Sequence, residues 1–171
     1  KKSVRQTTTN DIAEEAKVVR TTVYKYFKNR EEILRCVYRA DVEEFNAAFG
    51  KRCGRYNDFC SLLLGFMVYA LTESPKMRLY KSYFNDDSAP WIEEILLYDE
   101  GAIDSSVRLL SPHFEKALQS GEIRKGINLV EMVTWAHRIN SSTILSPVYK
   151  EQSIHQMRRQ VEQFFIQSIR A

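Results

Sequence analysis

Apolar residues recur at intervals of three and four along most of this 171-residue chain, and this spacing limits its fold more than any other feature. Only four prolines and six glycines punctuate the pattern. No stretch alternates apolar and polar residues as a half-buried strand does, and no hairpin signal separates two such stretches. The sequence therefore predicts an all-α protein.

Capping residues and helix breakers set the expected helix boundaries. A short helix over 11–16 follows three good N-cap residues, and a second short helix covers about 20–26. Asn29 is placed to cap a third helix, from residue 30 to about 49, with Glu32 in the capping-box position. Gly101 and Pro112 are expected to weaken or kink a later, long helix. The later helices are expected at about 57–73, 76–84, 89–119, 128–146 and 151–170.

The charge of the chain is concentrated near its start. Residues 17–30 carry five cations and no acid, while the whole chain has a net charge of +3, so the other residues sum to −2. A cationic block on a nearly neutral body indicates a local anionic partner, although charge alone also fits a solvated helix face. Two short helices joined by a tight turn form a helix-turn-helix, whose second helix enters the DNA major groove. The cationic block covers that second helix, so double-stranded DNA is the expected partner.

The residue types of this segment suit contacts with bases and phosphates. Arginine and threonine side chains reach base edges or thymine methyl groups, and tyrosine and lysine side chains donate to phosphate oxygens. Val23 and Phe27 are expected to face inward, against Ile12, Ala13, Ala16 and Val18. The residues expected at the DNA on these grounds are Arg20, Thr21, Thr22, Tyr24, Lys25, Tyr26 and Arg30.

Residues 8–34 resemble the DNA-binding signature of the tetracycline-repressor (TetR) family. That signature is a threonine, then I-A-x-x-A-G-V-S, three variable residues, and Y-x-x-F-x-(S/N)-K-E-x-L. The matching positions are Thr9, Ile12, Ala13, Ala16, Val18, Tyr24, Phe27, Asn29, Glu31 or Glu32, and Leu34. The resemblance adds Thr9 and Asn10 to the expected DNA contacts. It also implies a helix-turn-helix domain over 1–49, including the connecting helix, and an effector-binding and dimerisation domain over 50–171.

Three positions depart from the signature. Lys17 replaces the turn glycine, at a cost of about 1 kcal/mol if the position needs a positive φ. Val19 replaces the serine cap, so the second helix loses a side-chain cap. Arg30 replaces the family lysine and keeps its charge. The family's first helix has no counterpart in the eight residues before Thr9, so we expect the chain to begin after a segment that it does not include.

The resemblance implies a small-molecule cavity among the middle helices, where aromatic residues are frequent. Packed core is the simpler interpretation of those residues. Effector cavities are mainly apolar with a few polar groups, and the aromatic composition favours a small hydrophobic or aromatic effector, with or without an anionic group. The residues expected near this cavity are Phe66, Tyr69, Tyr83, Trp91, Tyr98, Trp135 and Arg138.

Two apolar stripes near the end of the chain fit either core or half of a four-helix dimer interface, and periodicity cannot decide between them. The resemblance, and the need for two half-sites on operator DNA, favour a homodimer. The residues expected at the dimer interface are Met132, Ala136, Ile154, Met157, Val161, Phe164 and Phe165.

The sequence gives little support for a metal site, a membrane span or a catalytic site. Three cysteines without metal-like spacing are expected to be reduced thiols in a cytoplasmic protein, and no apolar run is long enough to span a membrane. Glu151 and His155 are four apart, but no companion ligand supports a metal site, and neither an enzyme activity nor a cofactor is expected. The function expected is a ligand-responsive transcriptional regulator, most simply a repressor. The alternatives are a DNA-binding regulator with a solid core, and a helical ligand-binding or enzyme-like protein that does not bind DNA.

Overall fold

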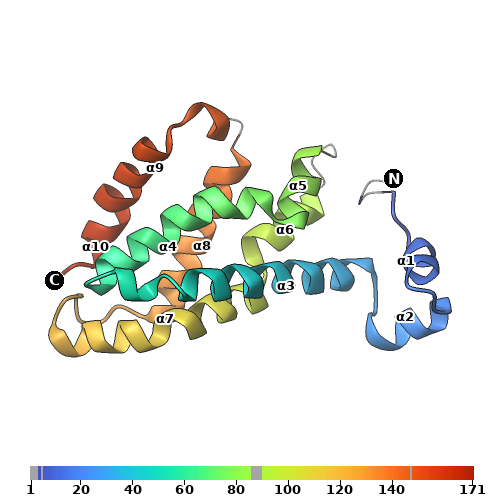
Figure 1. Cartoon of the computed structure of the whole chain (residues 1–171), viewed down its shortest axis with the longest axis horizontal. Coiled ribbons are helices and arrows are strands. Elements are labelled where there is room, and N and C mark those ends of the chain that lie inside the picture. Colours follow the sequence, from blue (N-terminus) through green and yellow to red (C-terminus); the bar gives the residue numbers. More distant parts are fainter. Residues whose placement is uncertain (1–3, 5, 86–89, 147) are drawn as a thin grey trace.

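The computed structural model describes residues 4, 6–85, 90–146 and 148–171, and the regular elements within these ranges are helical. Two short helices, α1 (Thr9–Glu15) and α2 (Arg20–Tyr26), form a head. A third, α3 (Arg30–Gly50), leads from the head into the body. Figure 1 shows the head projecting beyond the body at the N-terminal end of α3. The all-α class and the helix-turn-helix head are therefore confirmed.

The body is built from shorter helices than the sequence predicts. The helix expected over 89–119 is two helices, so that prediction was wrong, and its start at residue 89 lies outside the described residues. The helices of the body are α4 (Phe59–Glu73), α5 (Arg78–Asn85), α6 (Pro90–Tyr98), α7 (Glu100–Ser120), α8 (Leu129–Leu145), α9 (Ile154–Val161) and α10 (Gln167–Ile169). A π-helical turn (Glu162–Ile166) joins the last two, and 3-10 turns cover Cys53–Arg55, Ser74–Lys76 and Tyr149–Glu151.

The break between α6 and α7 falls at Asp99, whereas Gly101 and Pro112 lie within α7. The Asp99 carboxylate accepts a hydrogen bond from the backbone N–H of Ala102 at 3.0 Å, which caps α7. The same carboxylate accepts two hydrogen bonds from Arg39 of α3, at 2.7 and 3.1 Å. The capping residue of α7 therefore also attaches that helix to α3.

The long helix α3 belongs to both parts of the molecule. It packs along α7 and α5, while α4 packs against α8 and α9. The side chains of Tyr38, Val42, Phe45 and Phe49 are buried, so the C-terminal half of α3 contributes to the core of the body. A change in the packing of this half can therefore move the head, which continues from the other end of the helix.

The turn between α1 and α2 has the conformation that the glycine of the family signature would favour. Lys17 has a φ of 55°, in the left-handed region, which confirms the strain expected at this position. The N–H of Val18 donates to the carbonyl of Ala13, and that of Lys17 donates to Glu14, a Schellman arrangement that ends α1. Val19 then precedes α2 without a side-chain cap, also as expected.

Candidate DNA-binding head and central cavity

The head is held together by a small apolar contact between α1 and α2. Ala13 and Val23 are buried in it, and Ile12 and Phe27 are partly buried. Ala16 and Val18, which we expected to face inward, are exposed because they flank the turn at the edge of this contact. Thr8 caps α1 through a reciprocal capping box with Asp11, which fixes the first turn of that helix.

Eight of the nine residues predicted at the DNA lie on α1 and α2. Six are exposed and two, Thr9 and Thr22, are partly buried; the exposed ones are Asn10, Arg20, Thr21, Tyr24, Lys25 and Tyr26. Arg20 donates to the Tyr24 hydroxyl at 3.0 Å, and its guanidinium lies 5.2 Å from the centre of the Tyr24 ring. This hydrogen bond, with a smaller effect from Thr9, lowers the pKa of Tyr24. The exposed face of α2 thus offers cations, hydroxyls and aromatic edges to a ligand.

The ninth residue, Arg30, lies between the head and the body. Its side chain is partly buried, donates to the carbonyl of Val4, and stacks over the Trp91 ring of α6 at 4.9 Å. Arg30 therefore contacts the body, which differs from the expected phosphate contact. Asn29 caps α3 through the N–H of Glu32, as expected, but the Glu32 carboxylate reaches back to the N–H of Lys28.

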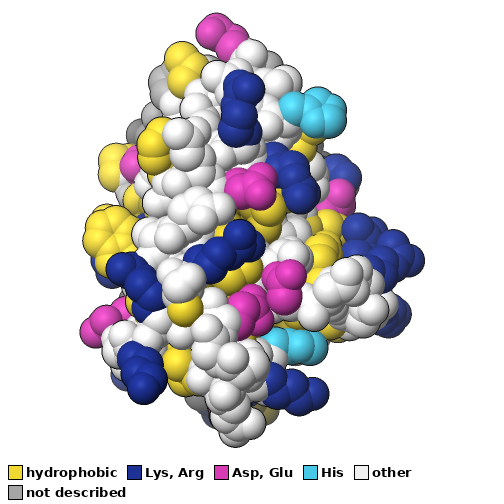
Figure 2. Space-filling model, turned by 90° about the vertical axis from the view of Figure 1, so that its left-hand side faces the viewer, with side chains coloured by type: hydrophobic (Ala, Val, Ile, Leu, Met, Phe, Trp, Pro, Cys, Tyr) yellow, Lys and Arg dark blue, Asp and Glu magenta, His cyan; other side chains and the backbone are white. Residues whose placement is uncertain are grey.

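The end of the body opposite the head has a different charge pattern. Figure 2 views the molecule from that end and shows Lys and Arg side chains interspersed with Asp and Glu side chains and with apolar patches. Within residues 17–30, by contrast, the five cations have no acid among them. An extended polyanion is therefore better matched by the head than by the opposite end.

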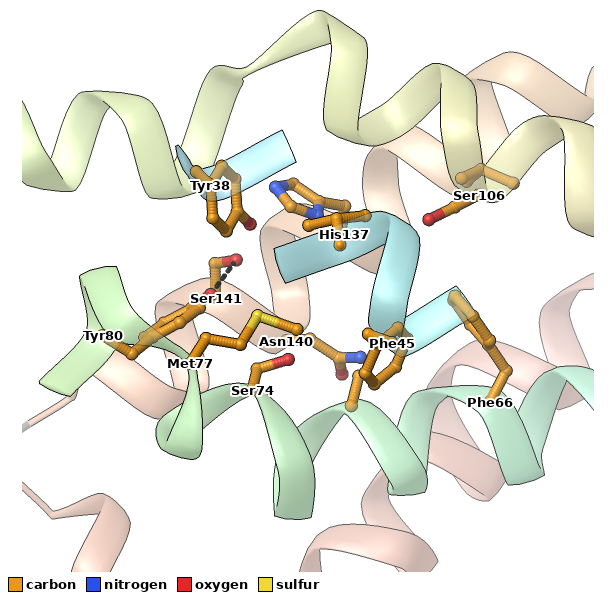
Figure 3. Close-up of a pocket in the computed structure, with 13 residues that line it drawn as sticks. Tyr38, Phe45, Phe66, Ser74, Met77, Tyr80, Ser106, His137, Asn140 and Ser141 are labelled. Atoms are coloured by element: carbon orange, nitrogen blue, oxygen red, sulfur yellow. Dashed lines mark hydrogen bonds between the residues drawn. The ribbon is translucent and has the colours of Figure 1, made fainter. Parts of the chain in front are cut away.

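A central cavity of about 40 Å³ lies inside the body, between α3, α4, α5, α7 and α8 (Figure 3). One side is mainly apolar and the other, on α8, is polar. The lining residues are Tyr38, Val42, Phe45, Phe66, Ala70, Ser74, Met77, Tyr80, Ser106, Val133, His137, Asn140 and Ser141. A site of this kind, apolar with a few convergent polar groups, is typical of small-molecule binding.

Hydrogen bonds fix most of the polar groups in this lining. Ser141 donates to the carbonyl of Leu96 at 3.0 Å, so the Tyr80 hydroxyl, 2.8 Å from the Ser141 oxygen, is the donor of that pair. His137 Nε2 lies 2.9 Å from the same carbonyl and therefore carries a proton. Burial lowers the pKa of His137 and raises the pKa of Tyr80 to about 12, so both rings are neutral near pH 7.

Of the residues predicted at the pocket, only Phe66 lines the central cavity. Tyr69 packs on Phe45 and Phe49, and Tyr83 packs edge-on against Phe84. The other four predicted residues lie outside the cavity. Trp91 contacts Arg30, Tyr98 contacts Arg138, and Trp135 is exposed to solvent. The lining thus differs from the predicted set because these rings pack against neighbours or face solvent.

The sequence of the head is similar to that of a known protein family. Residues 1–37 match the family model described as "Bacterial regulatory proteins, tetR family". Over these residues the chain is similar to TetR-family regulators. No curated protein sequence matches the chain. The likeness to this family therefore rests on the segment that also carries the signature residues.

Solved structures show that the fold of the whole chain is that of such regulators. It is similar to the ketosteroid transcriptional regulator KstR2 of Mycobacterium tuberculosis, with 15% identity, coverage of 98% of this chain and 87% of that one, and a TM-score of 0.58. It is similar to the transcriptional regulator FadR from Bacillus subtilis in complex with stearoyl-CoA, with 16% identity, coverage of 95% and 89%, and a TM-score of 0.63. A TetR/AcrR-family regulator from Thermobifida fusca has 15% identity, coverage of 95% and 88%, and a TM-score of 0.51.

Sequence reasoning missed the polar residues that α8 contributes to the cavity. His137, Asn140 and Ser141 continue the spacing of Val133, so all four lie on one face of the helix. Polar residues on an otherwise apolar, buried helix face were the signal that could have identified them.

The residues predicted at a dimer interface divide into two groups. Met132, Ala136, Met157 and Val161 are buried in the core of the subunit itself. Ile154 and Phe165 are partly buried, whereas Phe164 is 72% exposed. The four buried side chains therefore belong to the subunit core, and three of them, Met132, Met157 and Val161, also line surface hollows. Among the described residues, no helix is long and apolar enough to cross a membrane, and no cluster of metal-ligating side chains occurs.

Proposed function

We propose that this protein is a TetR-family repressor that binds operator DNA as a homodimer and is released by a small molecule held in the central cavity. The observation that carries the proposal is that α3 reaches both sites. Tyr38, Val42 and Phe45 of this helix line the cavity, and its N-terminal end connects directly to the DNA-binding head. The two functional parts are thus the head, formed by α1 and α2, and the body, joined by α3.

The small size of the cavity supports coupling between ligand and DNA. A volume of about 40 Å³ holds one or two water molecules, so a larger ligand must displace the walls. Because α3 forms one wall, such a displacement changes the position of the head. A ligand that binds only the displaced arrangement must weaken DNA binding by linkage.

The homodimer is supported by an exposed apolar face on α8 and the C-terminal helices. Trp135 is 60% exposed, and beside it two hollows of about 340 and 210 Å³ share Ile139 and Phe165 in their linings. Contiguous apolar surface of this kind marks interaction sites. Analytical ultracentrifugation should show a dimer that Phe164→Glu and Trp135→Glu disrupt, while Leu118→Glu, on the exposed side of α7, leaves it intact. A wild-type monomer at micromolar concentration would contradict this part of the proposal.

The two alternative functions, a regulator with a solid core and an enzyme-like protein, would require different structural features. A regulator with a solid core requires a packed interior, yet the central cavity contains the buried amide of Asn140 with an unpaired oxygen. We infer that the protein has no catalytic step of its own, because DNA binding and ligand binding account for the residues described. We also infer a cytoplasmic location, since a bacterial operator is reached there.

Anisotropy of labelled DNA from upstream of the gene tests the DNA-binding part. Arg20→Ala with Lys25→Ala should weaken binding at least tenfold, because two phosphate or base contacts are lost. Lys51→Ala with Arg55→Ala removes the same charge from exposed positions at the other end of α3 and should leave affinity within about twofold. Equal losses in both pairs would show that only net charge matters and would contradict the assignment of the head.

A further inference from the structure

The side-chain amide of Asn140 leaves one acceptor unpaired inside the central cavity. Asn140 is 5% exposed, and its Nδ2 donates to the carbonyl of Met67 at 3.2 Å. Since a carbonyl can only accept, this hydrogen bond fixes which end of the amide is nitrogen. The oxygen, Oδ1, has no hydrogen-bond partner among the described residues, and Asn140 is one of the side chains that line the cavity in Figure 3.

Several neighbouring polar groups of the lining direct their protons to other partners. The hydroxyl proton of Ser141 is directed to Leu96, and that of Tyr80 is directed to Ser141. Ser106 donates to the carbonyl of Ala102 at 3.4 Å and accepts from Asn46. A neutral His137 with its proton on Nε2 presents only an acceptor at Nδ1. These groups therefore offer acceptors to a ligand, beside the hydroxyls of Ser74 and Tyr38 in the same lining.

The cavity also lacks charge that could compensate an ion. The lining residues include no Asp, Glu, Lys or Arg. The two buried carboxylates among the described residues are already paired, Asp41 with Arg78 and Asp99 with Arg39. A buried ion without a partner is strongly disfavoured, and an anion would also face the Asn140 oxygen.

We propose that the ligand of the central cavity is a small neutral molecule that donates an O–H or N–H hydrogen bond to Asn140 Oδ1. Its remaining atoms contact the apolar wall formed by Phe45, Phe66, Met77 and Val133. The proposal rests on the proposed function for the role of the cavity, and it narrows the effector to neutral hydrogen-bond donors. An anionic effector is disfavoured, because the lining contains no Lys or Arg.

Four probes of equal size test this assignment: 2-propanol, acetone, acetate and isopropylammonium each have four heavy atoms in the same branched shape. Binding is followed by NMR, from the side-chain amide signals of Asn140 and the methyl signal of Met77. We expect saturable shifts with 2-propanol, binding of acetone that is roughly fivefold weaker because it cannot donate, and no saturable binding of either ion. Acetone or acetate binding as tightly as 2-propanol, or 2-propanol leaving the Asn140 signals unshifted, overturns the proposal.

Two variants of the same residue sharpen the test. In Asn140→Leu the preference for 2-propanol over acetone should disappear, and Asn140→Asp should allow isopropylammonium to bind at neutral pH. The ranking of the probes in the wild-type protein decides the question even if either variant fails to fold.

If 2-propanol fills the cavity and DNA affinity is unchanged, the cavity chemistry stands and the effector role fails. If acetate binds there and releases DNA, the effector role stands and the neutral-donor assignment fails.

Discussion

Replacement of Asp99 tests whether a buried carboxylate fastens α3 to the rest of the body. Asp99 is 1% exposed and lies at the break between α6 and α7. Its carboxylate caps α7, pairs in two-point fashion with Arg39, and lies 3.5 Å from the guanidinium of Arg35. The pair with Asp99 is the main cause that raises the pKa of Arg39. Loss of this one side chain therefore removes a helix cap and an interhelical charge pair together.

The two contributions can be separated by size. A helix N-cap contributes about 1 kcal/mol. A hydrogen bond to a charged group contributes about 1.5–3 kcal/mol, and the lower end applies here because the arginine side chains are 46% and 28% exposed. Asp99→Asn, which keeps an oxygen to cap α7, should thus cost about 1.5 kcal/mol of unfolding free energy. Asp99→Ala should cost about 2.5 kcal/mol, or roughly 5–10 °C in Tm.

Urea unfolding followed by circular dichroism measures these losses, with an unchanged slope as evidence that the folded state is intact. Glu94→Gln is the matched control, because Glu94 pairs with the same Arg35 at 3.3 Å but is 63% exposed. It should cost less than about 0.5 kcal/mol. If Asp99→Asn is as stable as the wild type, or no more harmful than Glu94→Gln, the charge pair does not hold α3 and the reasoning fails.

Three further predictions concern single positions. Lys17→Gly should raise stability by about 0.5–1 kcal/mol by relieving the left-handed backbone, whereas Lys17→Ala, which keeps a Cβ, should not; denaturation of both variants decides this. A Cβ at Gly101 would overlap Arg39, so Gly101→Ala should cost about 1–2 kcal/mol in the wild type but little in the Asp99→Ala background, as a double-mutant cycle would show. Because burial lowers the pKa of His137, the unfolded state binds its proton first. Stability should therefore fall below about pH 6.5, by up to 1.4 kcal/mol per pH unit, and His137→Gln should flatten this dependence.

The head could be predicted from the sequence because its determinants are local. The signature residues lie within about 27 consecutive positions, and the left-handed turn at Lys17 follows from its place in that signature. The contact of Arg30 with Trp91 could not be predicted, since it joins residues 61 positions apart in the sequence. Local patterns identify a domain well, whereas contacts between domains depend on how distant helices pack.

The break at Asp99 was missed for a related reason. Gly101 and Pro112 were weighed as breakers, yet α7 accommodates both. An aspartate followed by an acid in the first turn is a good helix start, and that signal was present at Asp99 and Glu100. Its burial depends on Arg39, which the sequence places 60 residues earlier. The cap was visible in the sequence, but the ion pair that secures it was not.

The cavity was mispredicted because residue type was given more weight than helix face. Large aromatic residues occur both in the core and on the surface, and Trp135, at 60% exposure, is an example of the second. The polar residues on the buried face of α8, among them His137 and Asn140, carried more information. A buried polar group needs a partner, and here that requirement points to a ligand.

The salt dependence of DNA binding tests the central claim most directly, since contacts with phosphates release counterions in proportion to their number. For each head, loss of Arg20 and Lys25 should reduce the slope of log affinity against log salt concentration by about 1.8 if both contact phosphates. The double variant of Lys51 and Arg55 should keep the wild-type slope. Equal slopes for the wild type and the Arg20 and Lys25 double variant would contradict the account, because the exposed face of α2 would then not contact the DNA.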